Sequence, residues 1–326
     1  MNWKKGIAVA FSAISIMAMV AGCGSNTATN DQKKIGVIQL VEHPSLDAAN
    51  KGFVDGLASK GYKDGENIKL DQQNAQADQS NLNSIAQRFV SDKKDLVLAI
   101  ATPSAQTMAN ASHDIPIMGT AITDYVTAKL VQSNEHPGGN VSGTSDMTPV
   151  EKEVDLIMAL VPNVKRIGAI YTSSEINSQL QVEKMKAYAA TKGITVVEAT
   201  VSNVNDIQQA ATNLVNQDVQ AIYTPTDNVL ASAMANLAQI TDAAKIPVFA
   251  ADEGMTMTGG VATYSVDYYK LGYQTGLMAA KVLSGEAKIS DLAIETQKDI
   301  KLTVNEERAK KLGITIPEAL RKDMKQ

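Results

Sequence analysis

The sequence predicts an α/β fold of two doubly wound parallel-sheet lobes joined by a three-strand hinge. Apolar, β-branched runs alternate with amphipathic helical patterns along nearly the whole chain, which is typical of parallel sheets covered by helices on both faces. A chain of 326 residues is long enough for two domains of ordinary size. Three landmarks also occur twice in the same order, so we expect the two lobes to share one design.

The repeated landmarks are short segments with the character of strands. KKIGVIQL at 33–40 recurs as KRIGAIYT at 165–172, and IPIMGTA at 115–121 recurs as IPVFAAD at 246–252. Between these segments, in each half, an apolar run ends in Thr-Pro and becomes helical. Proline suits the first helical turn, where its missing N–H would have had no partner. Each half is therefore expected to place hydroxyl side chains at the start of a helix.

The first residues have the pattern of a targeting segment. A positively charged start precedes an apolar run that is too short for a comfortable membrane span and ends in Val-Ala-Gly before Cys23. Small residues before the single cysteine resemble the bacterial lipobox. We therefore expect a signal peptide at 1–22, then a lipidated Cys23 with a polar tether over 23–33. An ordinary signal peptide with an incidental cysteine is the alternative.

Strands and helices alternate in the first half. Strands are expected at 34–40, at 67–73, just before Thr102 and at 115–120. One amphipathic stripe contains Phe53 and ends at Gly61, and a second contains Phe89. The second half restarts at Lys165. Its further strands are expected at 194–200, 219–224, 246–250, 261–266 and 300–304, with helical stripes at 207–215, 271–282 and 305–312.

We expect the chain to cross between the lobes three times, near Gly143, Gly254 and Gly285. Such a hinge places a ligand between the carboxyl ends of the two sheets. The first lobe then comprises 34–143 and 255–285, and the second comprises 144–254 and 286–326.

The two Thr-Pro helix starts predict a site for an anionic or zwitterionic group. Thr102 and Ser104 in one copy, and Thr226 and Asp227 in the other, lie beside unpaired N–H groups at the positive end of a helix dipole. We expect Thr102 and Ser104 to hold a ligand carboxylate. Plain helix capping is the alternative, as is a dipole-partner role for Asp227.

Acidic residues at strand ends are the expected partners of a ligand ammonium group. Asp252 ends a strand beside a crossing and is the preferred candidate, followed by Glu42, while Asp124 ranks lower because it suits a solvated loop. Ser173 and Asn177 are expected to contact the ligand from the second lobe, although such loops are also ordinary turn chemistry.

Other functions find little support. The formal charge of −5 and the lack of a Lys/Arg cluster in the body of the chain argue against nucleic acid. The three histidines, at 43, 113 and 136, lack the spacing of metal ligands, so we expect no metal and no cofactor. No Ser-His-Asp or Cys-His set is apparent, so we do not expect an enzyme.

Three segments, EHPSLD at 42–47, ADEGM at 251–255 and YSVDYYKLG at 264–272, add to the lipobox and the paired lobes. Together they resemble the ABC-transporter substrate-binding lipoproteins of the tryptophan/tyrosine-binding type. The resemblance covers nearly all of the mature chain. It implies a type I periplasmic binding protein fold that closes on its ligand.

The resemblance also implies the function. The protein would deliver a small ligand to ABC permease and ATPase subunits, from a lipid anchor on the outer face of the cell membrane. A Gram-positive envelope is expected, with a periplasmic lipoprotein as the alternative. The expected ligand is an aromatic or other apolar amino acid. A receptor for a sugar or nucleoside, or a ligand sensor feeding a signalling partner, are the alternatives.

Overall fold

The computed structural model describes residues 32–324. The predicted signal peptide at 1–22, Cys23 and the tether up to residue 31 lie outside these described residues. The chain from Gln32 onward forms one compact unit. Within the described part, no helix combines the length and the apolar content that a membrane crossing requires.

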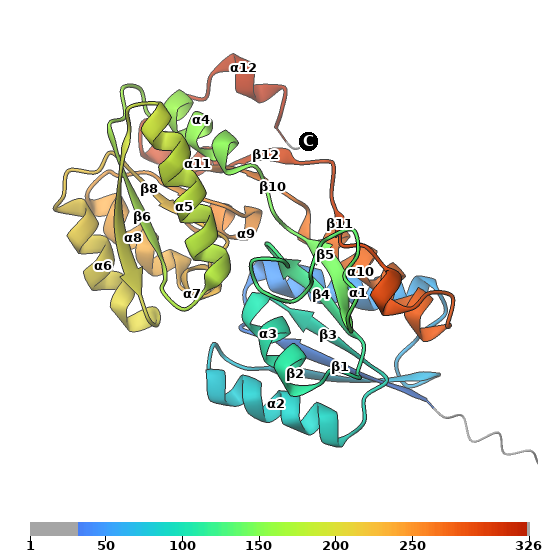
Figure 1. Cartoon of the computed structure of the whole chain (residues 1–326). Helices are drawn as coiled ribbons and strands as arrows, with labels where there is room; N and C mark the ends of the chain where they lie inside the picture. The colour runs from blue at the N-terminus through green and yellow to red at the C-terminus, as the bar shows by residue number, and fades with distance from the viewer. Residues whose placement is uncertain (1–31, 325–326) are drawn as a thin grey trace, which may run out of the picture. The chain divides into compact units, whose positions relative to one another are not determined.

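The first lobe is built on a six-stranded parallel sheet with the order β11-β5-β4-β3-β1-β2. Its strands are β1 (Lys33–Gln39), β2 (Ile68–Asn74), β3 (Leu96–Ile100), β4 (Ile117–Ile122), β5 (Val141–Ser145) and β11 (Glu295–Thr296). Its helices are α1 (Pro44–Ser59), α2 (Gln79–Ser91), α3 (Thr102–Ala111) and α10 (Tyr268–Leu283). Helices α1 and α10 pack together on one face, and α2 and α3 on the other (Figure 1).

The second lobe has a four-stranded parallel sheet with the order β7-β6-β8-β9. These strands are β6 (Arg166–Thr172), β7 (Thr195–Val201), β8 (Ala221–Thr224) and β9 (Val248–Ala250). An antiparallel pair, β10 (Ala262–Ser265) and β12 (Lys301–Val304), continues it, because Val261 N donates to Val248 O at 2.8 Å. The helices are α4 (Val150–Leu160), α5 (Ile176–Thr191), α6 (Ile207–Val215), α7 (Asn228–Ser232), α8 (Met234–Ala243), α9 (Glu253–Thr258), α11 (Glu306–Lys311) and α12 (Glu318–Arg321).

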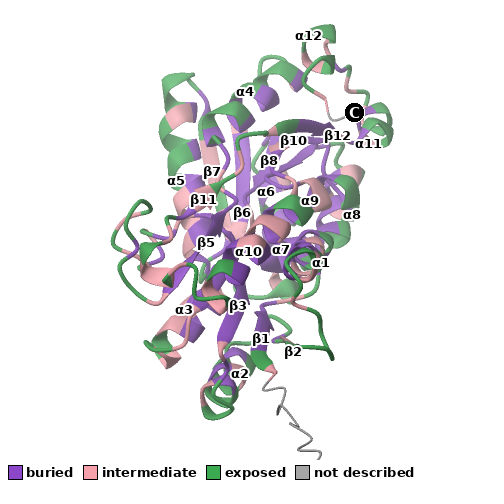
Figure 2. Ribbon diagram, turned by 90° about the vertical axis from the view of Figure 1, so that its right-hand side faces the viewer, coloured by how far each residue is buried: buried purple, intermediate pink, exposed green. Residues whose placement is uncertain are grey.

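The apolar cores explain why these elements form. The central strands are the most buried parts of both sheets (Figure 2), as expected when helices cover both faces. The first lobe has one core cluster around Ile35 and Phe53, and the second has two, around Ile167 and Ile222. The α/β fold of two lobes with parallel sheets is therefore confirmed.

The strand pairings correct the three predicted crossing points. The chain leaves the first lobe after β5, returns after β10 and leaves again after β11. The strand predicted at 261–266 was assigned to the first lobe, but β10 pairs with β12 in the second, and the helix that follows is the part that lies in the first lobe. The first lobe also continues past Gly285, because β11 pairs with β5.

The three glycines that marked these crossings have other roles. A Cβ on Gly143 would lie 2.0 Å from Gly119 O, so this glycine allows β5 to pack closely beside β4. Gly254 lies in the first turn of α9. Gly285 has a φ of +75° directly after α10, a conformation that glycine adopts at helix ends.

Glycines also bring α1 and α10 into backbone contact. A Cβ on Gly52 would lie 2.0 Å from Tyr269 O, and one on Gly272 would lie 1.8 Å from Ala49 O. Larger side chains would force the two helices apart. Helix α1 starts beside the second lobe, and α10 starts directly after a crossing. Their contact therefore fixes the N-terminal ends of both helices, which border the site described below.

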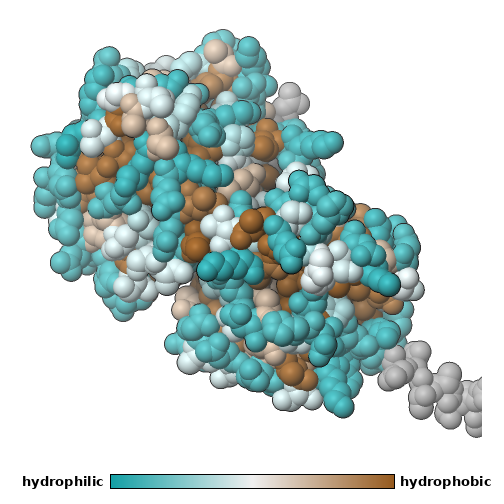
Figure 3. Space-filling view, viewed as in Figure 1, coloured by the Kyte–Doolittle hydropathy of each residue, from teal (hydrophilic) through white to brown (hydrophobic). Residues whose placement is uncertain are grey.

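The surface seen in Figure 3 is mostly hydrophilic, with apolar atoms in separate small areas. Isolated exposed apolar residues of this kind are normal for globular proteins. Within the described residues, the large exposed ones are Val126, Met158, Val204, Met257 and Tyr269.

Candidate ligand-binding cleft

Buried polar side chains gather where the strands of the two lobes end. They follow β1, β3, β4 and β5 in the first lobe and β6, β8 and β9 in the second. At this edge of a parallel sheet the helices begin, so unpaired N–H groups and capping side chains accumulate there. These residues are His43, Ser45, Thr102, Ser104, Thr123, Asp146, Thr172, Glu175, Asn177, Asp227, Asn228 and Asp252.

Direct hydrogen bonds join the two lobes at this edge. Ser45 Oγ, in the first turn of α1, donates to Asp252 Oδ1 at 2.8 Å. The hydroxyls of Thr123 and Thr226 are 3.0 Å apart. A cavity of about 10 Å³ lies beside them and is lined by His43, Leu46, Ala121, Asp146, Thr226, Asp227, Asn228, Asp252 and Tyr268. A space of this size holds roughly one water molecule.

Asp227 is the most heavily hydrogen-bonded acid of the cleft. It accepts from Thr172 N at 2.6 Å and Thr172 Oγ1 at 2.8 Å, from Ser178 Oγ at 2.8 Å, and from Leu230 N at 2.9 Å. The last bond caps α7. Burial nevertheless raises the pKa of Asp227, against the effect of these donors.

Glu175 lies next to Asp227 and is also buried. It accepts from Asn228 N at 3.1 Å and from Asn228 Nδ2 at 2.6 Å, and Asn177 Nδ2 donates to it at 3.0 Å. Burial, and then the negative charge of Asp227, raises the pKa of Glu175 to about 8.

Asp252 and His43 approach each other from opposite lobes. Asp252 caps α9 by accepting from Met255 N at 2.8 Å, in addition to the bond from Ser45. His43 Nε2 lies 3.5 Å from Asn228 Oδ1. Burial lowers the pKa of His43, so the ring is neutral at pH 7.

Asp146 lies at the first crossing, directly after β5. Its Oδ2 accepts a hydrogen bond from Tyr268 Oη at 2.8 Å, whereas its Oδ1 is buried without a partner within the described residues. Burial raises the pKa of Asp146 to about 6, although the hydroxyls of Tyr268 and Thr123 lower it. Sequence reasoning missed this residue, since it placed the crossing at Gly143; the signal was an acid directly after the strand.

The hydroxyls of Thr102 and Ser104 lie at the start of α3. Both are buried, and neither has a hydrogen-bond partner within the described residues. The strands that border them end in strained backbone, with φ +79° at Ala101 and +54° at Ala121. Buried polar groups without partners and non-glycine residues at positive φ both concentrate at functional sites.

The structure brings four of the remaining predicted residues into the cleft. These four are Asn177, Thr226, Asp227 and Asp252. Asn177 donates hydrogen bonds to Glu175 and to Thr226 O. The lining also contains Thr172, Glu175, Asn228, His43 and Tyr268, which were not among the predicted site residues.

Three predicted residues are placed elsewhere. Glu42 is exposed and lines a separate depression beside Gln72. Asp124 is half-buried and accepts from Thr127 N at 2.7 Å, which closes a local turn. Ser173 is exposed, and its hydroxyl is 3.4 Å from Val201 O. Within the described residues, no hydrogen bond joins the side chain of any of the three to a buried acid of the cleft.

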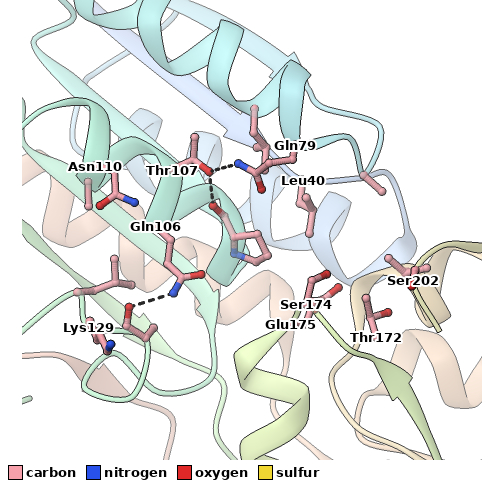
Figure 4. A pocket seen from close by; sticks show the side chains of 17 residues that line it. Leu40, Gln79, Gln106, Thr107, Asn110, Lys129, Thr172, Ser174, Glu175 and Ser202 are labelled. Carbon is pink, nitrogen blue, oxygen red and sulfur yellow. Dashed lines mark hydrogen bonds between the residues drawn. The ribbon is translucent and has the colours of Figure 1, made fainter. Parts of the chain in front are cut away.

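A larger cavity of about 440 Å³ opens between the lobes (Figure 4). Gln79, Gln106 and Thr107 line it from the first lobe, and Thr172 and Glu175 lie across from them. Gln79 Nε2 donates to Thr107 Oγ1 at 3.0 Å, so part of this wall is already fixed. Among the described residues, no group of three or more His, Cys, Asp or Glu side chains is arranged to hold a metal ion.

The chain is similar to proteins of known families. A family model described as ABC transporter substrate binding protein matches residues 34–326. A tyrosine-binding protein of Clostridioides difficile is 44% identical over 322 residues, which cover 95% of this chain and 93% of that protein.

Two solved structures are also similar. An ABC domain of Streptococcus pneumoniae in complex with L-Trp is 43% identical, with a TM-score of 0.87, and the match covers 90% of this chain and 99% of that one. A ligand-free, open substrate binding protein with adhesive properties from Clostridium difficile is 47% identical, with a TM-score of 0.67 and coverage of 90% and 98%. The better match to the complex, at lower identity, agrees with the hydrogen bonds that join the lobes here.

Proposed function

The chain belongs to the ABC transporter substrate binding protein family, and from this premise we propose that it captures an aromatic amino acid, tryptophan or tyrosine, for an importer. The observation that carries the proposal is the similarity, over almost the full chain, to a tyrosine-binding protein and to a protein solved with L-Trp. Relatives of this family carry different small molecules, so the chemistry of the cleft must support the choice.

The cleft offers both halves of the recognition that a zwitterion needs. The unpartnered hydroxyls of Thr102 and Ser104, together with the first N–H groups of α3, suit a carboxylate. Asp252, on the other lobe, suits the ammonium group as a charge-assisted acceptor. Thr226, Asp227 and Asn177 support these contacts. Glu42, Asp124 and Ser173 are not among these buried side chains.

We propose that the protein works outside the cytoplasm, anchored by lipid on Cys23, and passes its ligand to permease and ATPase subunits. Cys23→Ser should leave the two lobes folded but release the protein from the membrane, because the chain contains no other cysteine. The measurement is fractionation of cells with metabolic labelling by a fatty acid. Retention of label and membrane attachment by the variant would contradict the anchor.

The ligand assignment is tested with a chain that starts at Gly24. It keeps the whole compact unit from Gln32 onward and lacks Trp3, the only tryptophan of the sequence. The added tryptophan is then the only source of indole fluorescence, so on binding its emission should shift to shorter wavelength and its anisotropy should rise. Tyrosine should compete. The bound ligand should be recovered unchanged by mass spectrometry, as expected of a carrier. Failure of tryptophan, tyrosine and phenylalanine to bind would reject the aromatic assignment.

A further inference from the structure

We propose that Asp146 is the residue that selects for a protonated amine, by accepting a hydrogen bond from the ligand's ammonium group on its free Oδ1. The inference rests on the proposed function and deepens it, because it names a recognition residue on the hinge itself. Asp252 was the sequence-based candidate for this contact; Asp146 adds a second acceptor, on the segment that links the lobes.

The Asp146 carboxylate is held in a fixed position. The residue is 3% exposed and follows β5 at the first crossing. Its Oδ2 accepts from Tyr268 Oη at 2.8 Å, and Tyr268 begins α10 directly after the second crossing. Oδ2 is thus held by a residue that directly follows the second crossing. The Thr123 hydroxyl, which also lies near this carboxyl, is 3.0 Å from Thr226 Oγ1.

One oxygen of the Asp146 carboxylate lacks a hydrogen-bond partner. The small cavity is lined by three carboxylates, those of Asp146, Asp227 and Asp252. Asp227 is satisfied by Thr172, Ser178 and Leu230, and Asp252 caps α9, whereas Asp146 Oδ1 is buried without a partner within the described residues. A buried polar atom in this state costs free energy unless a ligand or water satisfies it.

The charge and the size of the small cavity indicate the chemical class of the partner. No lysine or arginine lines the cavity among the described residues, and burial leaves His43 neutral at pH 7. A hydrogen-bond donor that carries positive charge would pair with Oδ1 and also offset the charge of the three carboxylates. An ammonium group has three N–H donors and no acceptor, and a space of about 10 Å³ holds one small polar group. A primary ammonium group satisfies all three requirements.

The test compares two indole ligands that differ only in the amine. Tryptophan and indole-3-propionate share the ring and the carboxylate, and both report binding by indole emission in the chain that starts at Gly24. We expect the native chain to bind tryptophan at least 100-fold more tightly than indole-3-propionate. Asp146→Asn should lower that ratio at least tenfold, because it removes the negative charge but keeps the shape. Affinity for indole-3-propionate should be nearly unchanged.

Two further variants separate recognition from folding. Asp299→Asn makes the same change at an exposed acid in the third crossing segment and should leave the ratio as in the native chain. Tyr268→Phe keeps the ring but frees Asp146 Oδ2, and should lower the ratio by a smaller factor. This variant tests the contact even if Asp146→Asn folds poorly, which thermal unfolding of each variant will report.

The outcomes are distinct. A native chain that binds neither tryptophan nor tyrosine overturns the proposed function, and the ammonium contact with it. A native chain that binds tryptophan, combined with an unchanged ratio in both Asp146→Asn and Tyr268→Phe, overturns only the role of Asp146. A lowered ratio in these variants, with the native ratio in Asp299→Asn, supports the proposal.

Discussion

The two lobes repeat one design, but their facing edges carry hydroxyls and acids in different proportions. The first lobe presents the hydroxyls of Thr102 and Ser104 at the start of α3 and that of Thr123 after β4. Its buried acid at this edge is Asp146, at the crossing after β5, and its cleft histidine is neutral. The second lobe presents buried acids, Glu175, Asp227 and Asp252. Repetition of the βα unit therefore fixes where side chains lie, and the residue types at each helix start decide which end of a zwitterion each lobe prefers.

The strongest way to break this comparison is to remove an acid from the second lobe. Asp252→Ala should weaken tryptophan binding by about 2–5 kcal/mol, the range for removing one partner of a buried charge pair. It also removes the cap of α9 and the bond from Ser45. The control is indole-3-propionate, measured by the same fluorescence titration. An equal loss for both ligands would show that Asp252 acts through the structure and not through the ammonium group.

A second change disturbs the scaffold of the first lobe. Gly272→Ala should lower the free energy of unfolding by about 1–3 kcal/mol or more, because its Cβ would lie 1.8 Å from Ala49 O. Gly139→Ala is the matched control, since a Cβ there meets no atom within 4 Å. Urea titrations of the two variants decide the matter. Equal stability would mean that the contact between α1 and α10 is not tight.

A third change concerns a buried acid of the second lobe away from the cleft. Glu153, on α4, accepts from Tyr264 N at 2.7 Å and Thr263 Oγ1 at 3.2 Å, while its Oε2 has no partner within the described residues. Burial raises the pKa of Glu153 from 4.5 to about 8. The folded state therefore holds a proton that the unfolded state releases, so its contribution to stability falls as pH rises from 4.5 to about 8.

Glu153→Gln should remove this pH dependence. Relative to the native chain, the variant should gain on the order of 1–3 kcal/mol between pH 5 and pH 9. Glu151→Gln, at an exposed position in the same helical turn, should show no such gain. Parallel slopes of unfolding free energy against pH for the native chain and Glu153→Gln would contradict the assignment.

The smallest expected effect comes from removing a hydroxyl from the first lobe. Thr102→Val should weaken tryptophan binding by about 1–2 kcal/mol, because it removes one hydrogen bond while the backbone donors remain. The empty protein should become slightly more stable, since a buried hydroxyl without a partner is lost. Opposite signs in the binding and unfolding experiments are the test. Thr212→Val, on the exposed face of α6, serves as the control.

Much of the fold and part of the site could be predicted from sequence. Hydrophobic periodicity locates strands and helices, and the Thr-Pro pattern locates the start of α3 at Thr102. What sequence leaves undecided depends on single-residue register. Glu42 is exposed and His43 beside it is buried, just as Ser173 is exposed and Thr172 is buried. Neighbouring side chains point to opposite sides, so a position after a strand does not tell which of them enters the cleft.

The crossing points failed for a different reason. The apolar run at β10 fits either sheet by its pattern, and only long-range pairing with β12 decides that it belongs to the second lobe. Asp146 was missed with it, because its importance follows from the position of the crossing and from Tyr268, which is 122 residues away in the chain. Local patterns carry no information about such partners.

The contact between α1 and α10 has a consequence for how the molecule is made. In chain order, most of the second lobe, from α4 to β10, lies between the two helices. During synthesis, the glycine-lined side of α1 waits uncovered until residue 283 has left the ribosome, while residues 150–265 are already able to collapse. Such long-range closure is slow. The first lobe begins the chain, yet it cannot be complete until β11, at residues 295–296, has been made.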